Sequence, residues 1–269
     1  MFSFGIAVAI FSFLILLIST WTIFPLFPDA VGAAGTRVLS FVQPLVQRFF
    51  GVEPYAVFAS IALASLYALI CSIVVFFFFE KTLCHEILFF TFFALSFCLE
   101  SFRFVIPLCT GLNIPWVYAA LAGRVILFGR FFGILSFCAA SIYAAGFQTQ
   151  KQSNIILVSI VLAMIVAIGI PVDALSWDSG LNINVGYSIM LGLSEAGVFA
   201  ISAVSFFVGA YSRGSREFIP VGIGSILVFF GRNILLNCDT WVSLPIAAAL
   251  LAVGTWFVCS RLHRIYLWL

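Results

Sequence analysis

The chain has 269 residues, of which 64% are hydrophobic and only 8% are charged. Soluble domains carry about 25% charged residues, so this composition excludes an ordinary soluble domain and predicts an integral membrane protein. The formal net charge is only +2, and no basic stripe runs along the chain, which argues against a nucleic-acid partner. We therefore expect membrane lipids to be its constant partner.

Eight apolar segments are long enough to span a bilayer, because a transmembrane helix needs about 20 mostly apolar residues. Proline, glycine and polar residues interrupt the chain between these segments. The predicted fold is an all-α polytopic bundle, with residues 1–269 forming a single integral membrane domain. The predicted spans cover residues 3–25, 55–79, 86–108, 118–146, 154–171, 184–211, 218–236 and 241–260.

The first apolar segment could be either a retained span or a cleaved signal peptide. Its apolar run exceeds the roughly 7 to 15 residues of a signal-peptide core, and no Lys or Arg precedes it. No clear cleavage site of small residues follows the run. We therefore expect a first transmembrane helix, with the cleaved signal as the alternative.

The stretch between the first two predicted spans, residues 29–54, is the only long connection. Apolar residues recur within it at near-helical spacing, which predicts a short helix lying in the outer membrane interface and bent at Pro44. The apolar positions are Val38, Leu39, Phe41, Val42, Leu45, Val46, Phe49 and Phe50. Two roles remain open for this helix, a cap on the bundle or a lid over an outward-facing cavity.

Lys and Arg in short loops indicate the cytoplasmic side of a membrane protein. With eight spans, one side of the membrane receives six of these residues and the other receives two. The first group is Lys81, Lys151, Arg213, Arg216, Arg261 and Arg264, and the second is Arg37 and Arg48. This bias predicts a protein of the cytoplasmic (inner) membrane with both termini in the cytoplasm.

Six ionisable residues lie inside the predicted spans, namely Glu100, Arg103, Arg124, Arg130, Glu195 and Arg232. A charge at the middle of an isolated transmembrane helix costs roughly 2.5 to 3.5 kcal/mol, so such residues face the bundle interior or a wet cavity. At about 1.5 Å per helical residue, all six fall in the outer half of the bundle. We therefore expect them to surround one common cavity.

The balance of these charges suggests a function. Four arginines face two glutamates, and Glu100 and Arg103 are three residues apart and can pair on one helix face. Arginine cannot release its proton, and its planar guanidinium suits phosphate and carboxylate groups. The six residues therefore predict a ligand-binding site for an anionic solute or a lipid headgroup, which the protein binds or transports through an outward-facing, arginine-rich cavity.

The alternative is that the charges have a structural role. They would hold helices in register or dock a partner helix, and the surplus arginines would extend to the outer headgroups. The protein would then be a non-catalytic membrane sensor or an assembly subunit with a membrane-protein partner. Glycines fit either function, since Gly129 and Gly133 form a G-x-x-x-G pair that allows close helix packing, and Gly192 and Gly197 flank Glu195.

Residues for catalysis are not brought together by the predicted topology, which favours a protein without enzymatic activity. His85 and His263 both fall at the cytoplasmic boundary, so we expect no metal site and no intramembrane Ser–His pair. Group transfer with Glu100 or Glu195 as the base would lack a nucleophile or a metal set. We expect no cofactor.

The seven cysteines are scattered singly along the chain. Cys109 and Cys238 are predicted at the same outer edge, where an oxidising compartment would allow a disulfide. Two unpaired thiols are the other possibility.

Overall fold

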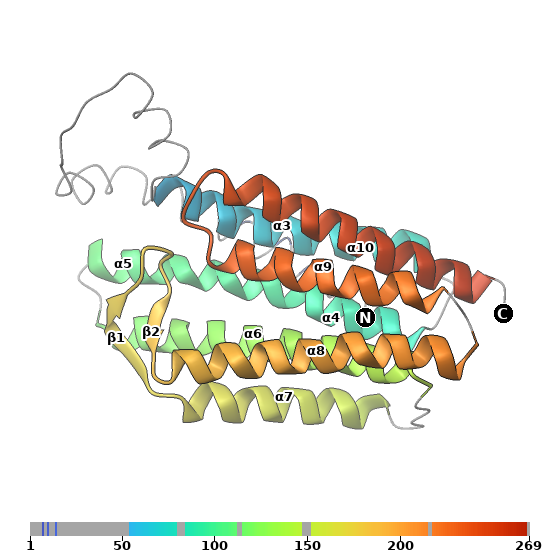
Figure 1. The fold of residues 1–269 in the computed structure, drawn as a ribbon. Helices are drawn as coiled ribbons and strands as arrows, with labels where there is room; N and C mark the ends of the chain where they lie inside the picture. The colour runs from blue at the N-terminus through green and yellow to red at the C-terminus, as the bar shows by residue number, and fades with distance from the viewer. Residues whose placement is uncertain are drawn as a thin grey trace, which may run out of the picture.

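The computed structural model describes residues 54–79, 84–111, 115–146, 152–214 and 217–267, together with Ala7, Ile10 and Leu14. Within these residues, seven helices are long and apolar enough to cross a membrane. They run side by side along one direction (Figure 1), as expected for a helical membrane bundle. The first predicted span, apart from those three helical residues, and the predicted interfacial helix lie outside the described residues.

The order of elements follows the predicted spans from the second to the eighth. One span is composite, because α4, η2 and α5 follow one another without a break and together cross the bundle as His85–Cys109. The elements are α3 (Pro54–Phe79), α4 (His85–Ser96), η2 (Phe97–Phe104), α5 (Val105–Gly111), α6 (Val117–Ala144), α7 (Gln152–Gly169), β1 (Val172–Trp177), β2 (Ile183–Val185), α8 (Ser188–Ser212), α9 (Phe218–Leu236) and α10 (Ser243–Leu267).

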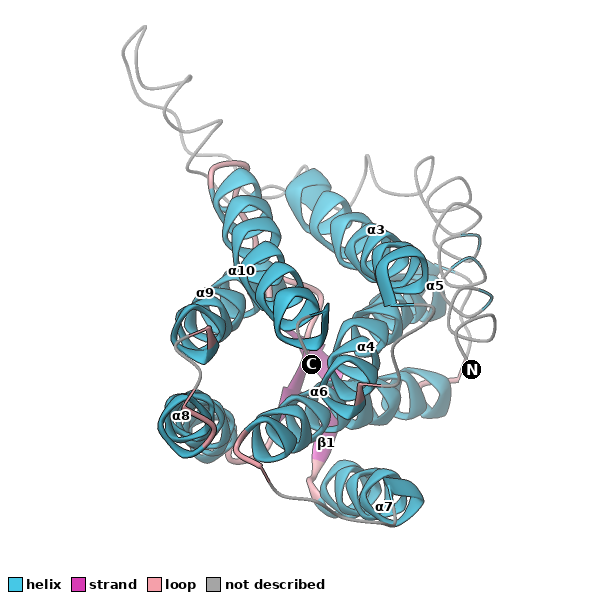
Figure 2. Ribbon diagram, turned by 90° about the vertical axis from the view of Figure 1, so that its right-hand side faces the viewer, coloured by secondary structure: helices cyan, strands magenta, loops and turns pink. Residues whose placement is uncertain are grey.

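The helices are covered to very different degrees. Seen along the bundle (Figure 2), α4 and α6 lie at the centre, while α7 and α8 lie at one edge. The composite span through α4 is 72% buried over its most apolar window, against 17% for α7 and for α8. Phenylalanines fill the centre, as in the contact between Phe93 of α4 and Phe137 of α6, whose ring centroids are 5.0 Å apart.

Glycines allow the central helices to approach closely, as the G-x-x-x-G pair predicts. A Cβ added at Gly129 would lie 2.8 Å from the Leu99 Cβ, and one added at Gly133 would collide with Ser96. Any larger residue would therefore push α6 away from η2 and α4. This close approach places α6 directly beside the segment that carries Glu100 and Arg103.

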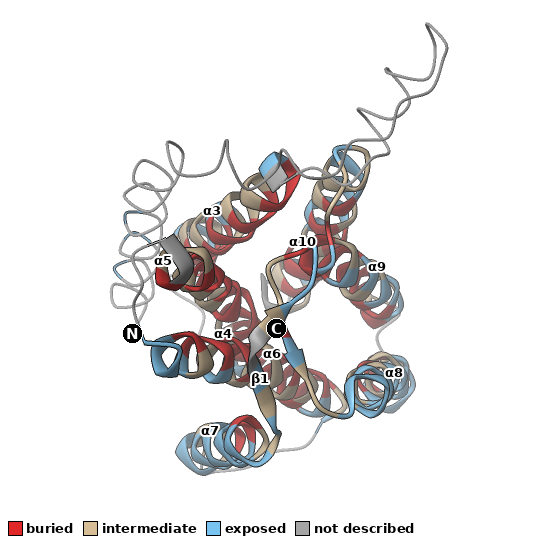
Figure 3. Ribbon diagram, turned by 90° about the vertical axis from the view of Figure 1, so that its left-hand side faces the viewer, coloured by how far each residue is buried: buried red, intermediate tan, exposed pale blue. Residues whose placement is uncertain are grey.

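A β-hairpin, which the sequence did not predict, crosses one end of the helical bundle. β1 pairs with β2 in antiparallel fashion, with an irregularity between Asp173 and Trp177. Ile183, predicted to lie in a loop, is instead a buried residue of β2, next to Gly123 of α6. In Figure 3 the strands lie across the end of the bundle, which we call the hairpin end.

The tip of the hairpin is anchored in the bundle. Leu181 packs against a small apolar cluster of Val57 and Ile61 from α3 and Phe104 from η2. The backbone hydrogen bonds between the strands would not by themselves hold so short a hairpin, because two isolated strands are marginally stable. The anchoring by Leu181 therefore explains why the turn sits against the helices.

At the opposite end, α10 continues to Leu267, beyond the predicted limit of the last span at residue 260. The prediction stopped there because Arg261, His263 and Arg264 are polar. In the structure Arg261 pairs with Glu217 at 2.8 Å, and the His263 ring lies 5.3 Å from the Phe79 ring. Because these polar residues have partners, the helix can continue beyond its apolar region.

Candidate functional site

Five of the six predicted site residues meet at the hairpin end. Glu100 and Arg103 come from η2, and Arg130, Glu195 and Arg232 come from α6, α8 and α9 respectively. Asn182 of the hairpin joins them through Arg130. We call these six residues the arginine cluster.

Glu100 is the shared centre of the arginine cluster. Its carboxylate accepts two hydrogen bonds from Arg130, from Nε at 2.8 Å and from Nη2 at 3.1 Å. On its other side, Arg103 Nε lies 2.7 Å from Oε2 as an ion pair, although this N–H is not directed for a hydrogen bond. A 3₁₀ segment has about three residues per turn, so Glu100 and Arg103 lie directly above one another.

Arg103 is 1% exposed and also binds backbone oxygens from two other elements. Its Nη2 donates to the Leu236 carbonyl at 2.8 Å, and its Nη1 donates to the Gly180 carbonyl at 3.5 Å. Leu236 ends α9, where unpaired carbonyls carry partial negative charge. Arg103 thereby joins η2 to the end of α9 and to the hairpin turn.

Arg130 is the more accessible member of the pair that shares Glu100. Its Nη2 donates to Asn182 Oδ1 at 2.7 Å, and its side chain is 18% exposed. The other terminal nitrogen, Nη1, makes no hydrogen bond to a described residue. Among the residues that the structure describes, this edge of the guanidinium therefore has no hydrogen-bond partner.

Arg232 links α8, at the edge of the bundle, to α6 at its centre. Its Nη1 donates to Glu195 Oε2 at 3.0 Å, and its Nη2 donates to the Arg130 carbonyl at 3.4 Å. The guanidinium carbon also lies 5.8 Å from the centre of the Phe199 ring, within the range of a cation–π contact. Arg232 is 2% exposed and Glu195 18%, so this pair is buried on the arginine side.

Arg124 does not join the arginine cluster, which corrects the prediction that all four arginines converge. It is exposed, whereas Arg130 on the same helix points inward. Arg130 is six positions after Arg124, and at about 100° per residue the two side chains project about 120° apart around α6. The expected surplus of two positive charges is therefore one within the cluster, from three arginines and two glutamates.

Asn182 was missed by the sequence-based reasoning. It carries no charge and lies outside every apolar segment, so neither composition nor depth marks it. The run Asp178–Ser179–Gly180 is a turn signal between two apolar stretches, and it could have indicated the hairpin. The contact with Arg130 depends on where the hairpin folds, which no local pattern specifies.

Cys109 and Cys238, for which either a disulfide or two unpaired thiols were possible, are both free and buried in the structure. The sulfur of Cys238 faces its own connection to α10, with Ser243 Oγ at 3.0 Å and the Thr240 carbonyl at 3.4 Å. These polar neighbours satisfy a thiol without a second cysteine. Within the part of the chain that the structure describes, no group of His, Cys, Asp and Glu is arranged to hold a metal ion.

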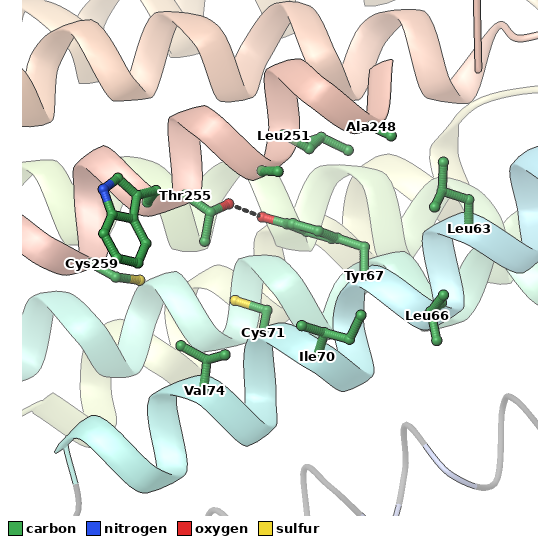
Figure 4. Close-up of a pocket in the computed structure, with 12 residues that line it drawn as sticks. Leu63, Leu66, Tyr67, Ile70, Cys71, Val74, Ala248, Leu251, Thr255 and Cys259 are labelled. Carbon is green, nitrogen blue, oxygen red and sulfur yellow. Dashed lines mark hydrogen bonds between the residues drawn. The ribbon is translucent and has the colours of Figure 1, made fainter. Parts of the chain in front are cut away.

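An apolar cavity of about 350 Å³ lies between α3 and α10 (Figure 4). Its lining includes Leu66, Ile70 and Trp256, and a hydrogen bond of 2.8 Å joins Tyr67 Oη to Thr255 Oγ1 across it. No arginine or carboxylate lines this cavity. It is therefore distinct from the arginine-rich cavity predicted from the sequence and does not suit an anion.

Comparisons with known proteins do not indicate a function for this chain, so the function is inferred from the geometry of the site. No protein-family model matches the chain, and no curated protein or solved structure matches it. The arginine cluster combines an excess of positive charge, deep burial and one open guanidinium edge. Such an arrangement is suited to hold an oxyanion or to fix helices by ion pairs.

Proposed function

We propose that the protein binds an anionic solute or a lipid headgroup at the hairpin end of its bundle, with Arg130 as the residue that reaches the ligand. The carrying observation is the unequal charge of the arginine cluster together with the open Nη1 of Arg130. An unbalanced charge among membrane-spanning helices is costly, so an anion that neutralises it binds favourably. The guanidinium fork suits phosphate and carboxylate oxygens.

The predicted orientation places the hairpin end on the outer side of the cytoplasmic membrane. A soluble anion would then arrive from the outside, and a lipid headgroup from the outer leaflet. Transport of the same anion is the extended form of this proposal, and uptake into proteoliposomes tests it separately from binding.

Purified protein titrated with inorganic phosphate, and protein in nanodiscs with or without phosphatidylglycerol, tests the binding proposal. We expect Arg130→Gln to weaken binding at least about tenfold, equivalent to about 1.4 kcal/mol. Arg130→Lys keeps the charge but loses the fork, so it should fall between the variant and the wild type. Arg124→Gln, on the exposed face of the same helix, is the matched control and should bind as the wild type does.

Equal affinity of the wild type, Arg130→Gln and Arg130→Lys for every probe would refute this function. Circular dichroism and size-exclusion profiles of each variant establish that it is folded. Because Arg130→Lys retains the positive charge beside Glu100, it remains informative even if the glutamine variant is unstable.

The second candidate is a sensor or assembly subunit that docks a partner helix. One observation favours it, since an added Cβ at Gly192 or Gly197 of α8 would meet nothing within 4 Å. Exposed glycines on a poorly covered helix allow close approach of another helix. Here the arginine cluster would hold α8 in place through Glu195 and Arg232.

Substitution of the exposed glycines discriminates between the two candidates. If α8 docks a partner, Gly192→Leu and Gly197→Leu should abolish copurification of that partner from native membranes while leaving the isolated bundle folded. If α8 faces lipid, both variants should retain wild-type associations and wild-type phosphate binding. Ala200→Leu, also at an exposed position of α8, is the control for added bulk.

A further inference from the structure

We infer that the hairpin turn Gly180–Asn182 occupies an oxyanion site formed by Arg103 and Arg130, and that the hairpin must lift for a phosphate or carboxylate group to bind both guanidinium groups. This inference rests on the proposed anion-binding function and adds the position of the site and the element that controls access to it. The ligand class is an oxyanion, either free in solution or part of a lipid headgroup.

Two oxygens of the turn bind two guanidinium groups that share one carboxylate. The Gly180 carbonyl accepts from Arg103 Nη1 at 3.5 Å, and Asn182 Oδ1 accepts from Arg130 Nη2 at 2.7 Å. Both turn oxygens are neutral, whereas Glu100 supplies the one negative charge between the two arginines. Hydrogen bonds from arginine to an ionised acceptor are stronger than those to a neutral one, so an oxyanion can compete for the positions of the turn oxygens.

The backbone of the turn is strained at the residue between these two contacts. Leu181 has a φ of 54°, in the left-handed region that non-glycine residues rarely adopt. Strain of this kind persists only where the surrounding structure enforces it, and it is concentrated at switch regions and ligand clamps. The pairing of β1 with β2 is also irregular between Asp173 and Trp177. The turn is held by its own backbone hydrogen bonds, from Asp178 N to the Asn182 carbonyl at 2.8 Å and from Leu181 N to the Asp178 carbonyl at 2.9 Å, and by its contacts with the bundle.

The guanidinium groups would stay in place when the turn lifts. Glu100 would still bind Arg130 through two hydrogen bonds, and the Leu236 carbonyl would still bind Arg103. The site is therefore preorganised. The movement would cost the burial of Leu181 among the apolar residues of α3 and η2 and that of Ile183 beside Gly123, which explains why the closed arrangement prevails without a ligand.

A disulfide between α6 and the hairpin tests the movement directly. A Cβ added at Gly123 would lie 3.6 Å from the Ile183 Cβ. Disulfides have Cβ–Cβ distances of about 3.5 to 4.5 Å, so Gly123→Cys with Ile183→Cys should form a bond that holds the hairpin closed. We expect the oxidised double variant to bind inorganic phosphate at least about tenfold more weakly than the same protein after reduction.

The wild type, oxidised and reduced in the same way, controls for the seven native cysteines. A parallel titration in nanodiscs with and without phosphatidylglycerol distinguishes a lipid headgroup from free phosphate. If oxidation abolishes the binding of phosphatidylglycerol in nanodiscs and leaves the binding of free phosphate unchanged, the site belongs to a lipid headgroup.

Two substitutions of Asn182 should act in opposite directions. Asn182→Ala removes the competing oxygen and should tighten phosphate binding about three- to tenfold, whereas Asn182→Asp supplies an internal carboxylate to Arg130 and should weaken binding by at least that factor. A purely structural role for Asn182 would lower stability in both variants without this opposition in affinity.

Several outcomes would overturn the inference. If the oxidised and reduced double variant bind equally, and both Asn182 variants bind as the wild type does, the hairpin does not control the site. Sensitivity of the same binding to Arg130→Gln would then show that the proposed function survives without the hairpin movement. If no probe binds to the wild type or to Asn182→Ala, both the function and the inference are refuted.

Discussion

The charged residues at the two ends of the bundle differ in how they are paired and how deeply they are buried. At the hairpin end, three arginines share two glutamates, and Arg103 and Arg232 are almost fully buried. At the other end, the arginines of the described ion pairs are partly exposed to solvent. Arg261 pairs with Glu217 at 2.8 Å, and the Arg213–Glu86 distance is 3.5 Å, with about 30% of each arginine side chain exposed.

This difference shows which charges require an explanation. A partly exposed ion pair is worth about 0 to 1 kcal/mol and serves as an ordinary helix-end contact. A buried, unequal cluster is costly to assemble, because the desolvation penalty of buried charges can exceed their attraction. Such a cluster persists where the fold or the function needs it.

The largest effect should come from removing the shared carboxylate. Glu100→Gln leaves Arg103 and Arg130 without their common counter-charge, and breaking a buried ion pair on one side costs about 3 to 5 kcal/mol. We expect a marked fall in the unfolding midpoint, measured by thermal denaturation in detergent. A midpoint within a degree or so of the wild type would remove the distinction between the two ends.

An intermediate effect is expected from two glycine substitutions, which together distinguish a loss of stability from a loss of phosphate binding. Gly129→Ala beside η2 and Gly209→Ala at the other end both create close contacts, 2.8 Å from the Leu99 Cβ and 2.7 Å from the Ala144 carbonyl. Overpacking of this kind costs about 1 to 3 kcal/mol, so both variants should lose similar stability. Only Gly129→Ala displaces the segment that carries Glu100, so phosphate affinity should fall in that variant alone. Equal affinities would argue against the hairpin end as the binding site.

The smallest effect should come from the exposed pair. Glu217→Gln removes the partner of Arg261, and we expect a loss of at most about 1 kcal/mol. Because salt screens partly exposed charges, the loss should diminish as ionic strength rises. The measurement is the same thermal denaturation at low and high salt. A loss as large as that of Glu100→Gln would show that burial does not distinguish the two ends.

Much of the fold could be predicted because lipid imposes a length and a polarity on every span. The seven described membrane-length helices lie close to their predicted positions. The errors fall where local patterns are weak. The hairpin was predicted as a loop and the start of a span, since β2 has only three residues. The last helix was predicted too short, because the polar residues after 260 find partners in space.

The site could be predicted only in part. The pairing of Glu100 with Arg103 follows from their spacing on one segment. The pairing of Arg130 with Glu100, and of Arg232 with Glu195, depends on how separate helices are rotated. Arg124 illustrates the limit, since it has the same chemistry as Arg130 and lies on the same helix but projects from an exposed face.

The sequence by itself determined that this chain forms a bundle of apolar helices and that a few charges lie within them, since composition and segment length depend on residues close together in the chain. The tertiary structure decided which charges meet, because helix rotation and the path of the hairpin arise from packing between distant segments. It brought Asn182 to Arg130 and left Arg124 outside. It thereby reduced the surplus to one charge and set a strained turn against the two arginines that share Glu100.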